Sequence, residues 1–237
     1  MKGLIHFHSN HSYDSVNSME SIMSFIQNES IGFLVLTDHE TIKGSLELRA
    51  ATKANNIQVV TPIAAEYKTD CGDLIAIFIK EEIEDMSAEG FIKEVHDQGG
   101  LVLIPHPYVG HKNLEKITSL VDAVEVYNPR CSDIENEKAS KLACKYGKPI
   151  YHGTDAHTIQ EMGNSIIKVK SISNEAELRE LLLNSKCISS NQKKSQSRFV
   201  FFSQMVRGFK TGNLKIIIKN VLKVLILYLT GKRERTV

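Results

Sequence analysis

The segment His6-Phe7-His8-Ser9-Asn10-His11-Ser12-Tyr13-Asp14-Ser15 follows a short apolar run at the start of the chain. In an extended strand, residues i and i+2 point to the same face, so His6 and His8 can reach one ion together. Imidazole nitrogens are ligands that Zn²⁺, Mn²⁺ and Fe²⁺ accept. A single pair of this kind is weak evidence for a metal site, so the remainder of the chain has to supply its partners.

Further imidazole and carboxylate side chains recur along the chain, each close to the end of an apolar run. Asp155 and His157 repeat the i, i+2 spacing far from the first pair. The other candidates are Asp38, His39, Glu66 and His106. An acid placed like Glu66 is costly to bury unless it is paired. The dispersed set therefore predicts a metal centre assembled from distant segments.

Alternating apolar runs and segments of period 3.6 predict an α/β fold. The expected strands are 3–6, 33–37, 58–62, 74–79, 101–104, 123–126, 149–151 and 166–169. The expected helices are 19–28, 43–55, 87–98, 136–146 and 175–183. Such alternation is typical of a mostly parallel sheet or barrel. The candidate ligands fall at the carboxyl ends of the expected strands, where barrel enzymes carry their active sites.

The motifs in residues 1–184 resemble those of the PHP (polymerase and histidinol phosphatase) family of metallophosphoesterases. The matching segments are His6 to Ser15, Thr37-Asp38-His39, Glu66, His106-Pro107, Glu125-Val126-Tyr127-Asn128 and Gly153-Thr154-Asp155-Ala156-His157. The resemblance is nearest to small stand-alone members that act on phosphorylated metabolites, nucleotides or RNA ends. It implies a distorted (β/α)7 TIM-like barrel of the PHP type.

The resemblance also implies two or three divalent ions, with Mn, Zn or Fe expected and Mg as an alternative. His6, His8, Glu66 and Asp155 would surround one ion, Glu66 would bridge to a second ion held by His106, and Asp14, His39 and His157 would hold a third. Glu66, Asp155 and His157 are the expected catalytic residues. Ions bridged in this way stand about 3.5–4 Å apart and clamp the oxygens of a phosphoryl transfer.

Three acidic residues leave alternatives open. Asp14 lies among serines, so a helix cap or Asx-turn competes with a ligand role. Asp38 is expected to orient His39 rather than to bind an ion. Asp73 stands where the metabolite- and RNA-directed relatives usually carry a further His, and it either replaces that ligand or does not bind. An oxygen ligand there would shift the preference from Zn²⁺ toward Mn²⁺ or Mg²⁺.

The expected reaction is hydrolysis of a phosphate ester by a metal-activated water. Arg130 is the expected phosphate clamp, because a guanidinium binds phosphate through two parallel hydrogen bonds, and His111 and Lys112 are further candidates on the rim. The substrate would be a small phosphorylated molecule, a nucleotide or RNA. Two alternatives stay open: a catalytically weak regulatory module that binds metal and a phosphorylated ligand, and a metal-dependent amidohydrolase.

Composition separates the 237-residue chain into two parts. Residues 1–190 carry 18 Lys/Arg and 27 Asp/Glu, whereas residues 191–237 carry 11 Lys/Arg and a single acid, Glu234. We therefore expect a PHP barrel over 1–190 and a basic amphipathic tail over 191–237. The four cysteines, Cys71, Cys131, Cys144 and Cys187, form no C-x-x-C pair and are expected to be reduced thiols. The N-terminus lacks the apolar stretch of a signal peptide, so a cytoplasmic protein is expected.

The tail contains a lysine every four residues, at Lys215, Lys219 and Lys223, within the otherwise apolar segment 214–229. Lys232, Arg233 and Arg235 follow. A basic stripe beside a wide apolar face predicts an interfacial helix on anionic lipid. A helix that docks on the barrel or on a second copy, giving an oligomer, and an RNA contact are the alternatives. The segment 192–198 is expected to be a polar linker.

Overall fold

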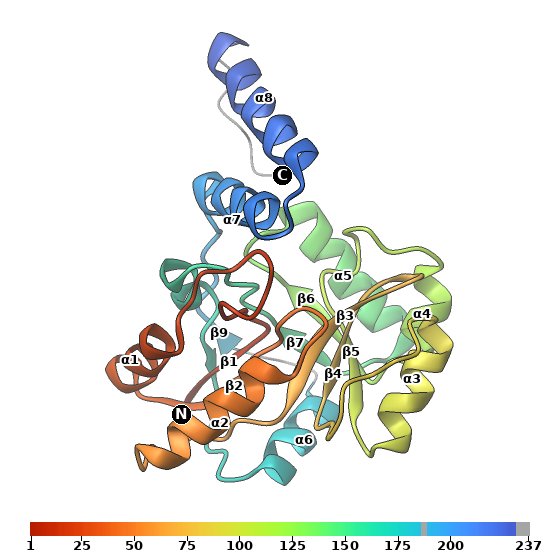
Figure 1. The fold of residues 1–237 in the computed structure, drawn as a ribbon. Helices are drawn as coiled ribbons and strands as arrows, with labels where there is room; N and C mark the ends of the chain where they lie inside the picture. The colour runs from red at the N-terminus through yellow and green to blue at the C-terminus, as the bar shows by residue number, and fades with distance from the viewer. Residues whose placement is uncertain (186–188, 231–237) are drawn as a thin grey trace.

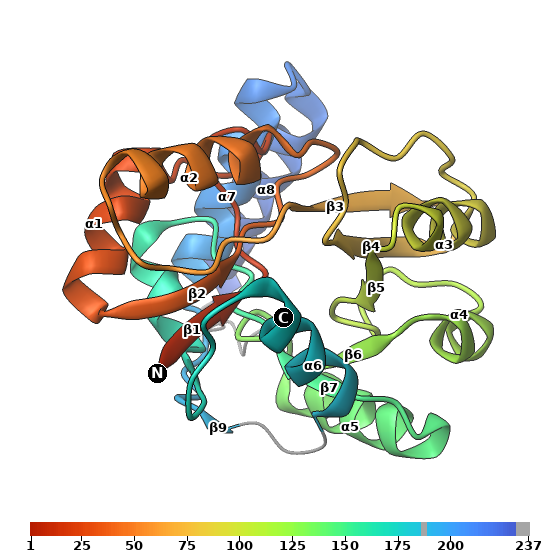
Figure 2. The same ribbon diagram turned by 90° about the horizontal axis from the view of Figure 1, so that it is seen from below.

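The computed structural model describes residues 1–185 and 189–230 and shows a mixed α/β fold (Figures 1 and 2). One sheet has the strand order β2-β1-β8-β9 and the other has the order β3-β4-β5-β6-β7. The strands are β1 (Lys2–Ile5), β2 (Ile31–Val35), β3 (Ala64–Thr69), β4 (Gly72–Ile77), β5 (Leu101–Ile104), β6 (Ala123–Tyr127), β7 (Ile150–His152), β8 (Ile167–Lys168) and β9 (Ser189–Ser190).

Helices follow most of the strands and lie outside them in both views (Figures 1 and 2). They are α1 (Met19–Glu29), α2 (Lys43–Ala54), α3 (Ala88–Asp97), α4 (Leu114–Leu120), α5 (Asp133–Tyr146), the 3₁₀ helix η1 (Ile159–Asn164), α6 (Glu175–Asn184), α7 (Ser197–Lys210) and α8 (Leu214–Thr230). Local sequence explains several boundaries. Ser132 and Glu135 form a capping box at the start of α5, and Gly147 ends that helix with a φ of 61°.

Parallel pairing is confirmed for three strand pairs, namely β1 with β2, β5 with β6 and β6 with β7. The pairs β3 with β4 and β4 with β5 are antiparallel instead. The reason lies in the short connection after Thr69: Gly72 adopts a φ of 124°, which glycine tolerates, and the chain returns at once as a hairpin. In the first sheet, β8 also pairs antiparallel with both β1 and β9, so the predicted mostly parallel order holds only for the three parallel pairs.

The strand predicted at 58–62 is wrong. Within that segment only Val60 forms an isolated bridge, to Phe33, and the strand begins later, at Ala64. Glu66 consequently lies inside β3 rather than beyond a strand end. The short helix α4 and the start of α7 inside the predicted linker were not predicted.

The two sheets do not form one continuous barrel ladder. Single bridges join the two sheets, between His39 after β2 and Glu66 in β3, and between Phe7 after β1 and Ala156 after β7. One buried apolar cluster also draws on strands of both sheets, including Ile5 and Phe33 from the first sheet and Tyr151 from the second. The ends of β1, β2, β3 and β7 are thereby held together at one edge.

Gly3 tests the packing inside this core. A Cβ atom at Gly3 would lie 2.1 Å from Cε1 of the buried Phe33 ring, so Gly3→Ala must displace that ring. We expect the free energy of unfolding to fall by about 1–3 kcal/mol, as for other overpacked cores. Urea denaturation measures it, with Gly163→Ala as the control because no atom lies within 4 Å there. Equal midpoints for the two variants would contradict this packing.

Candidate metal centre

Eight side chains from six segments converge where the two sheets meet. His6 and His8 follow β1, Asp14 lies in the next loop, His39 follows β2, Glu66 lies in β3, His106 follows β5, and Asp155 and His157 follow β7. Their atoms are close and nearly all buried: His6 and His8 are fully inaccessible and Glu66 is 1% exposed. The structure thus brings together the whole predicted ligand set except Asp73.

Glu66 is the centre of the cluster. Its Oε2 lies 3.4 Å from a ring nitrogen of each of His6, His8 and His39. Its Oε1 lies 3.3 Å from Nε2 of His106. One carboxylate therefore faces four imidazoles, and its two oxygens point to different members of the group.

The backbone is strained at the same place. His6, His106 and Asp155 have φ angles of 64°, 27° and 48°. Non-glycine residues rarely adopt this left-handed region, and each instance costs on the order of 1–3 kcal/mol. Strain at three ligand positions is typical of a site whose geometry is imposed by the surrounding fold.

Hydrogen bonds determine which ring nitrogen of His6 and of His157 faces the centre. Nδ1 of His6 lies 2.9 Å from Oε1 of Glu125, and Nδ1 of His157 lies 3.0 Å from the carbonyl oxygen of Asp155. Both acceptors require a proton on Nδ1, which leaves the lone pair on Nε2. Outer partners of this kind commonly orient histidines that bind metal.

His8 reaches the same state through Ser12. The Ser12 hydroxyl donates to Oδ1 of Asp38 at 2.8 Å and accepts from the His39 backbone N–H at 3.0 Å. Its remaining lone pair is available to Nδ1–H of His8 at 3.2 Å. Asp38 also accepts from the backbone N–H and the hydroxyl of Ser9, at 2.7 and 2.6 Å. Asp38 thus reaches the His39 backbone through Ser12, in agreement with the prediction that it orients His39 rather than binding an ion.

The charge states suit metal binding. Burial raises the pKa of the Glu66 carboxyl, but His6 and His39 outweigh it and hold this pKa well below its usual range. Burial together with His157 and His39 lowers the pKa of His8 to about 3. Burial lowers the pKa of His39, yet Glu66 and Asp14 raise it overall to about 9. In the absence of ions, protons on imidazoles thus compensate buried carboxylates, and divalent cations can take over that role.

The cluster also contains buried nitrogen and oxygen atoms that lack hydrogen-bond partners and could bind a metal ion instead. Five buried polar atoms here have no hydrogen-bond partner: Nε2 of His6, Nε2 of His8, Oδ1 of Asp14, Oε1 of Glu66 and Nδ1 of His106. Ligands about 2.1 Å from a tetrahedral ion stand about 3.4 Å apart. The distances of 3.3–3.4 Å between the Glu66 oxygens and the imidazole nitrogens match that separation between two ligands.

Three groups of donors can each surround an ion: His6 with His8 and Asp155, His6 with Glu66 and His106, and His8 with His39 and His157. Oδ2 of Asp14 lies 3.3 Å from Nε2 of His39 and 3.2 Å from Nε2 of His157, so it completes the third group. The helix-cap alternative for Asp14 is not supported, because Ser18 caps α1.

Asp73 does not join the centre. Its Oδ1 pairs with Nζ of Lys68 at 3.0 Å, and within residues 1–185 and 189–230 it belongs to no group of converging donors. The ligand alternative for Asp73 is therefore wrong in this structure. The hairpin at Gly72 places its carboxylate beside the lysine of the neighbouring strand.

Arg130 is not a free phosphate clamp, contrary to the prediction. Its Nε and Nη2 donate to the two oxygens of the buried Glu161 at 3.1 and 2.9 Å, and Nη1 donates to Ser203 at 3.2 Å. Glu161 also accepts from the backbone N–H groups of His157 and Thr158. Arg130 therefore supports the loop that carries His157.

His111 and Lys112 lie near the rim, on the far side of His106. The His111 ring is 5.9 Å from the His106 ring, and its Nε2 lies 2.8 Å from the carbonyl oxygen of Asp73. Lys112 is exposed, and its backbone N–H donates to Cys71. A substrate role for either residue stays a prediction.

Helix α7 reaches the metal loop from the part of the chain predicted to be a tail. Nζ of Lys210 donates to the carbonyl oxygens of Asn10, Ser12 and Ser15, each at 2.8 Å. The Arg207 guanidinium lies 4.9 Å from the centre of the Tyr13 ring, which stacks on His39 at 4.6 Å. The helix thus clamps the loop that carries Asp14.

Several residues that shape the centre lie within the sequence motifs, but the motifs predict no specific role for them. Oε2 of Glu125 accepts from the backbone N–H of His106 and from Asn128, whose amide also donates to Asp155. Gly153 makes room for Glu125, since a Cβ there would lie 1.6 Å from Oε1. Gly44 does the same for Asp38, at 1.8 Å. The only sequence signal was the position of Glu125, Asn128 and Gly153 inside the quoted motifs.

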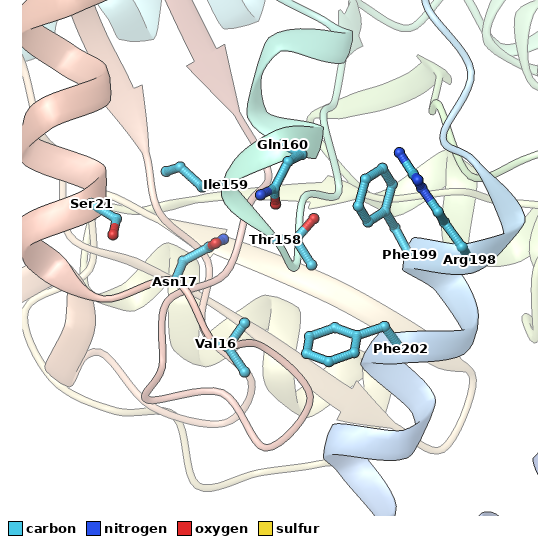
Figure 3. A pocket seen from close by; sticks show the side chains of 9 residues that line it. All are labelled: Val16, Asn17, Ser21, Thr158, Ile159, Gln160, Arg198, Phe199 and Phe202. Carbon is cyan, nitrogen blue, oxygen red and sulfur yellow. The ribbon is translucent and has the colours of Figure 1, made fainter.

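A pocket of about 610 Å³ lies beside the centre, between η1, the loop before α1 and α7 (Figure 3). It is lined by Val16, Asn17, Ser21, Thr158, Ile159, Gln160, Arg198, Phe199 and Phe202. None of the converging donors lines it, and its mainly apolar wall does not suit a phosphate group.

Comparisons with known proteins agree with the geometry. Residues 133–187 match the family model described as PHP-associated. An uncharacterised protein of Methanocaldococcus jannaschii is 32% identical over 142 residues, which cover 54% of this chain and 82% of the relative. The chain belongs to the PHP family.

Solved structures share the fold at low identity. A two-domain protein of Bacteroides vulgatus that contains a predicted PHP-like metal-dependent phosphoesterase has a TM-score of 0.66 at 15% identity, covering 86% of this chain and 68% of its own. An amidohydrolase from Chromobacterium violaceum has a TM-score of 0.57 at 14% identity, covering 83% and 99%. These likenesses establish the fold.

Glu125 tests the outer support of the centre. Glu125→Gln places an amide N–H₂ either against Nδ1–H of His6 or against the N–H donors of His106 and Asn128, and Gly153→Ala pushes the Glu125 carboxylate away from His6. We expect either variant to bind Zn²⁺ or Mn²⁺ about 10–100-fold more weakly, the usual cost of losing an outer partner. Competition with a chromophoric chelator measures this. Gly163→Ala is the control, and unchanged affinity in both variants would refute the role of Glu125.

Lys210 tests the support from α7. Lys210→Met removes three hydrogen bonds to the loop that carries Asp14, so we expect weaker binding of the ion held by Asp14, His39 and His157. The chelator titration should lose its step for one ion and keep the others. Lys53→Met, at an exposed lysine of α2, is the control. A titration identical to that of the wild type would show that the clamp is dispensable.

Proposed function

We propose that the chain is a metal-dependent phosphoesterase that hydrolyses a phosphate ester at a dinuclear or trinuclear site. One observation carries the proposal: the buried Glu66 carboxylate faces His6, His8 and His39 with one oxygen and His106 with the other. A carboxylate placed in this way can join two ions, whereas a neutral imidazole cannot. Paired ions are typical of phosphoryl-transfer sites.

The side chains divide the work by position. Glu66 and Asp155 supply anionic oxygens, and His6, His8 and His157 present Nε2 lone pairs because their Nδ1 protons are engaged elsewhere. Divalent ions, when bound, provide a water nucleophile at neutral pH and neutralise charge on phosphoryl oxygens. Burial of the cluster excludes bulk water and strengthens each electrostatic contact within it.

The opening of the centre lies among the few partly exposed donors. The side chains of His39, His106 and Asp155 are 14%, 11% and 12% exposed, whereas those of His6 and His8 are buried. A phosphate ester would approach from this side, past Tyr13 and His111. Because Arg130 is engaged with Glu161, the bound ions and the rim side chains would supply the contacts to the phosphate.

Finer features follow the family pattern and are part of the proposal. We infer that the two bridged sheets act as a distorted seven-stranded barrel, that Mn, Zn or Fe is the native metal, and that the substrate is a small phosphorylated metabolite, a nucleotide or an RNA end. A donor set that consists only of histidines and carboxylates suits Mn²⁺, Fe²⁺ and Zn²⁺ alike. With Asp73 withdrawn to Lys68, the extra oxygen ligand that would favour Mg²⁺ is missing from the cluster.

Amide hydrolysis is the second candidate, because the amidohydrolase from Chromobacterium violaceum shares the fold. A similar His and Asp cluster can activate water against a C–N bond. The two reactions need different help from the metal ions. Hydrolysis of a phosphate ester requires that negative charge be neutralised on several phosphoryl oxygens at once. Since two-metal sites also hydrolyse C–N bonds, the preference for the phosphoesterase rests on the likeness to PHP-like metal-dependent phosphoesterases.

Metal and turnover should be lost together when Glu66 is changed. Glu66→Gln replaces the bridging anion by an amide, so we expect at least one ion fewer per chain and a loss of turnover of about 10³-fold or more. Elemental analysis and assays of phosphomonoesters, nucleotides and 5′-phosphorylated RNA with added Mn²⁺ measure the two quantities. Glu47→Gln, at a surface carboxylate paired with His11, is the control.

The same assays contain the outcomes that exclude the proposal. Full activity after complete chelation would remove the metal mechanism. Turnover of N-acyl amino acids in place of phosphate esters would identify the amidohydrolase. Metal-loaded protein that binds phosphorylated ligands and turns over none of them would identify the regulatory module.

A further inference from the structure

The last two helices expose a continuous set of large apolar side chains, which we call the tail surface. It consists of Phe209, Leu214, Ile218, Val221 and Leu222, whose exposed fractions are 69%, 69%, 57%, 45% and 52%. Elsewhere in the described residues, Tyr108 and Val109 are adjacent in one loop, and other exposed apolar side chains, such as Ile134, are far apart in the sequence. The tail surface is therefore a feature that the phosphoesterase proposal leaves unexplained.

Helix geometry places the tail surface on one side of α8. Leu214, Ile218, Val221 and Leu222 have the spacing of one helical face, and Lys215 and Lys219 border that face. A different side of α8 packs on α7. There Ile217 lies close to Gly208, because a Cβ atom added at Gly208 would lie 2.5 Å from Cγ1 of Ile217. In Figure 1, α8 extends from α7 away from the barrel. The apolar face is thus presented outward.

The positive charge of the tail indicates which partner the tail surface binds. Residues 191–230 contain eight Lys or Arg and no acid. Two tails brought face to face would repel each other, whereas an anionic bilayer offers both an apolar layer and negative headgroups. Lysines beside an apolar stripe can extend to the headgroups while the stripe is buried. Within the described residues, no helix combines the length and apolarity needed to cross a bilayer.

We propose that the tail surface binds an anionic lipid bilayer, with α8 lying in the headgroup region and its apolar face toward the acyl chains. Binding is peripheral and combines burial of the apolar face with attraction of the lysines. Because Lys210 of α7 holds the loop 10–15 and Phe209 is its neighbour, the bilayer lies next to the side of the barrel that carries this loop.

Vesicle flotation tests the proposal on the full chain. The wild type should float with vesicles of phosphatidylcholine and phosphatidylserine at low salt, bind less at high salt, and not float with phosphatidylcholine alone. Lys215→Gln with Lys219→Gln should weaken the partition coefficient about 25-fold, at roughly fivefold for each lysine. Ile218→Asp should abolish flotation, because a charge enters the apolar face.

Matched variants on the barrel separate the tail from general surface effects. Lys53→Gln and Ile134→Asp change an exposed lysine of α2 and a 65% exposed isoleucine of α5, and both should float like the wild type. Unchanged melting temperatures confirm that all variants are folded. Since flotation needs no turnover, its outcome is independent of the phosphoesterase proposal.

Three results would overturn the proposal. The first is a wild type that stays unbound with anionic vesicles at low salt. The second is flotation of Ile218→Asp at the wild-type level. The third is sedimentation of the wild type as a dimer that Ile218→Asp dissociates, without vesicle binding, which would make a second copy the occupant.

Discussion

The structure depends on one constraint, the burial of the Glu66 carboxylate among four imidazoles. A carboxylate that is 1% exposed needs compensating charge, and every neighbouring element helps to supply it. The first parallel strand pair delivers His6, His8 and His39, the second sheet delivers His106, and the bridge between Phe7 and Ala156 brings Asp155 and His157 to the same edge. Strained φ angles at three of these positions agree with a surrounding fold that holds the ligands in place.

Support for the centre extends outward in layers. Glu125 links His6, His106 and Asn128 in one buried network, and Asp38 links Ser9 and Ser12 in another. Two glycines, Gly44 and Gly153, leave the space in which these carboxylates sit. Helix α7 adds a further layer through Lys210 and through Ser203, which accepts from Arg130. Part of the predicted tail is therefore tied to the site that the α/β fold of residues 1–185 builds.

The ligand set was predictable because its signal is local: two i, i+2 pairs and a few acids or histidines next to apolar runs. The strand at 64–69 was not, because 58–62 is equally apolar and only the hairpin at Gly72 settles which segment pairs. Asp73 and Arg130 were misassigned for a related reason. Their chemistry suits a ligand and a clamp, but their tertiary partners, Lys68 and Glu161, lie in segments that no local pattern connects to them. Likewise, charge counting marked the basic tail without revealing that α7 reaches the loop 10–15. The basic end, with Lys232, Arg233 and Arg235, and Cys187 lie outside the described residues.

Anomalous X-ray diffraction at the absorption edge of the bound metal, from crystals of the metal-loaded protein, tests the central claim most directly. If Glu66 joins two ions, anomalous peaks will flank its carboxylate, one on the side of His6 and His8 and one on the side of His106, about 3.5–4 Å apart. A third peak between Asp14, His39 and His157 is consistent with the account. A single peak remote from Glu66, or none in this cluster at full metal loading, would contradict it.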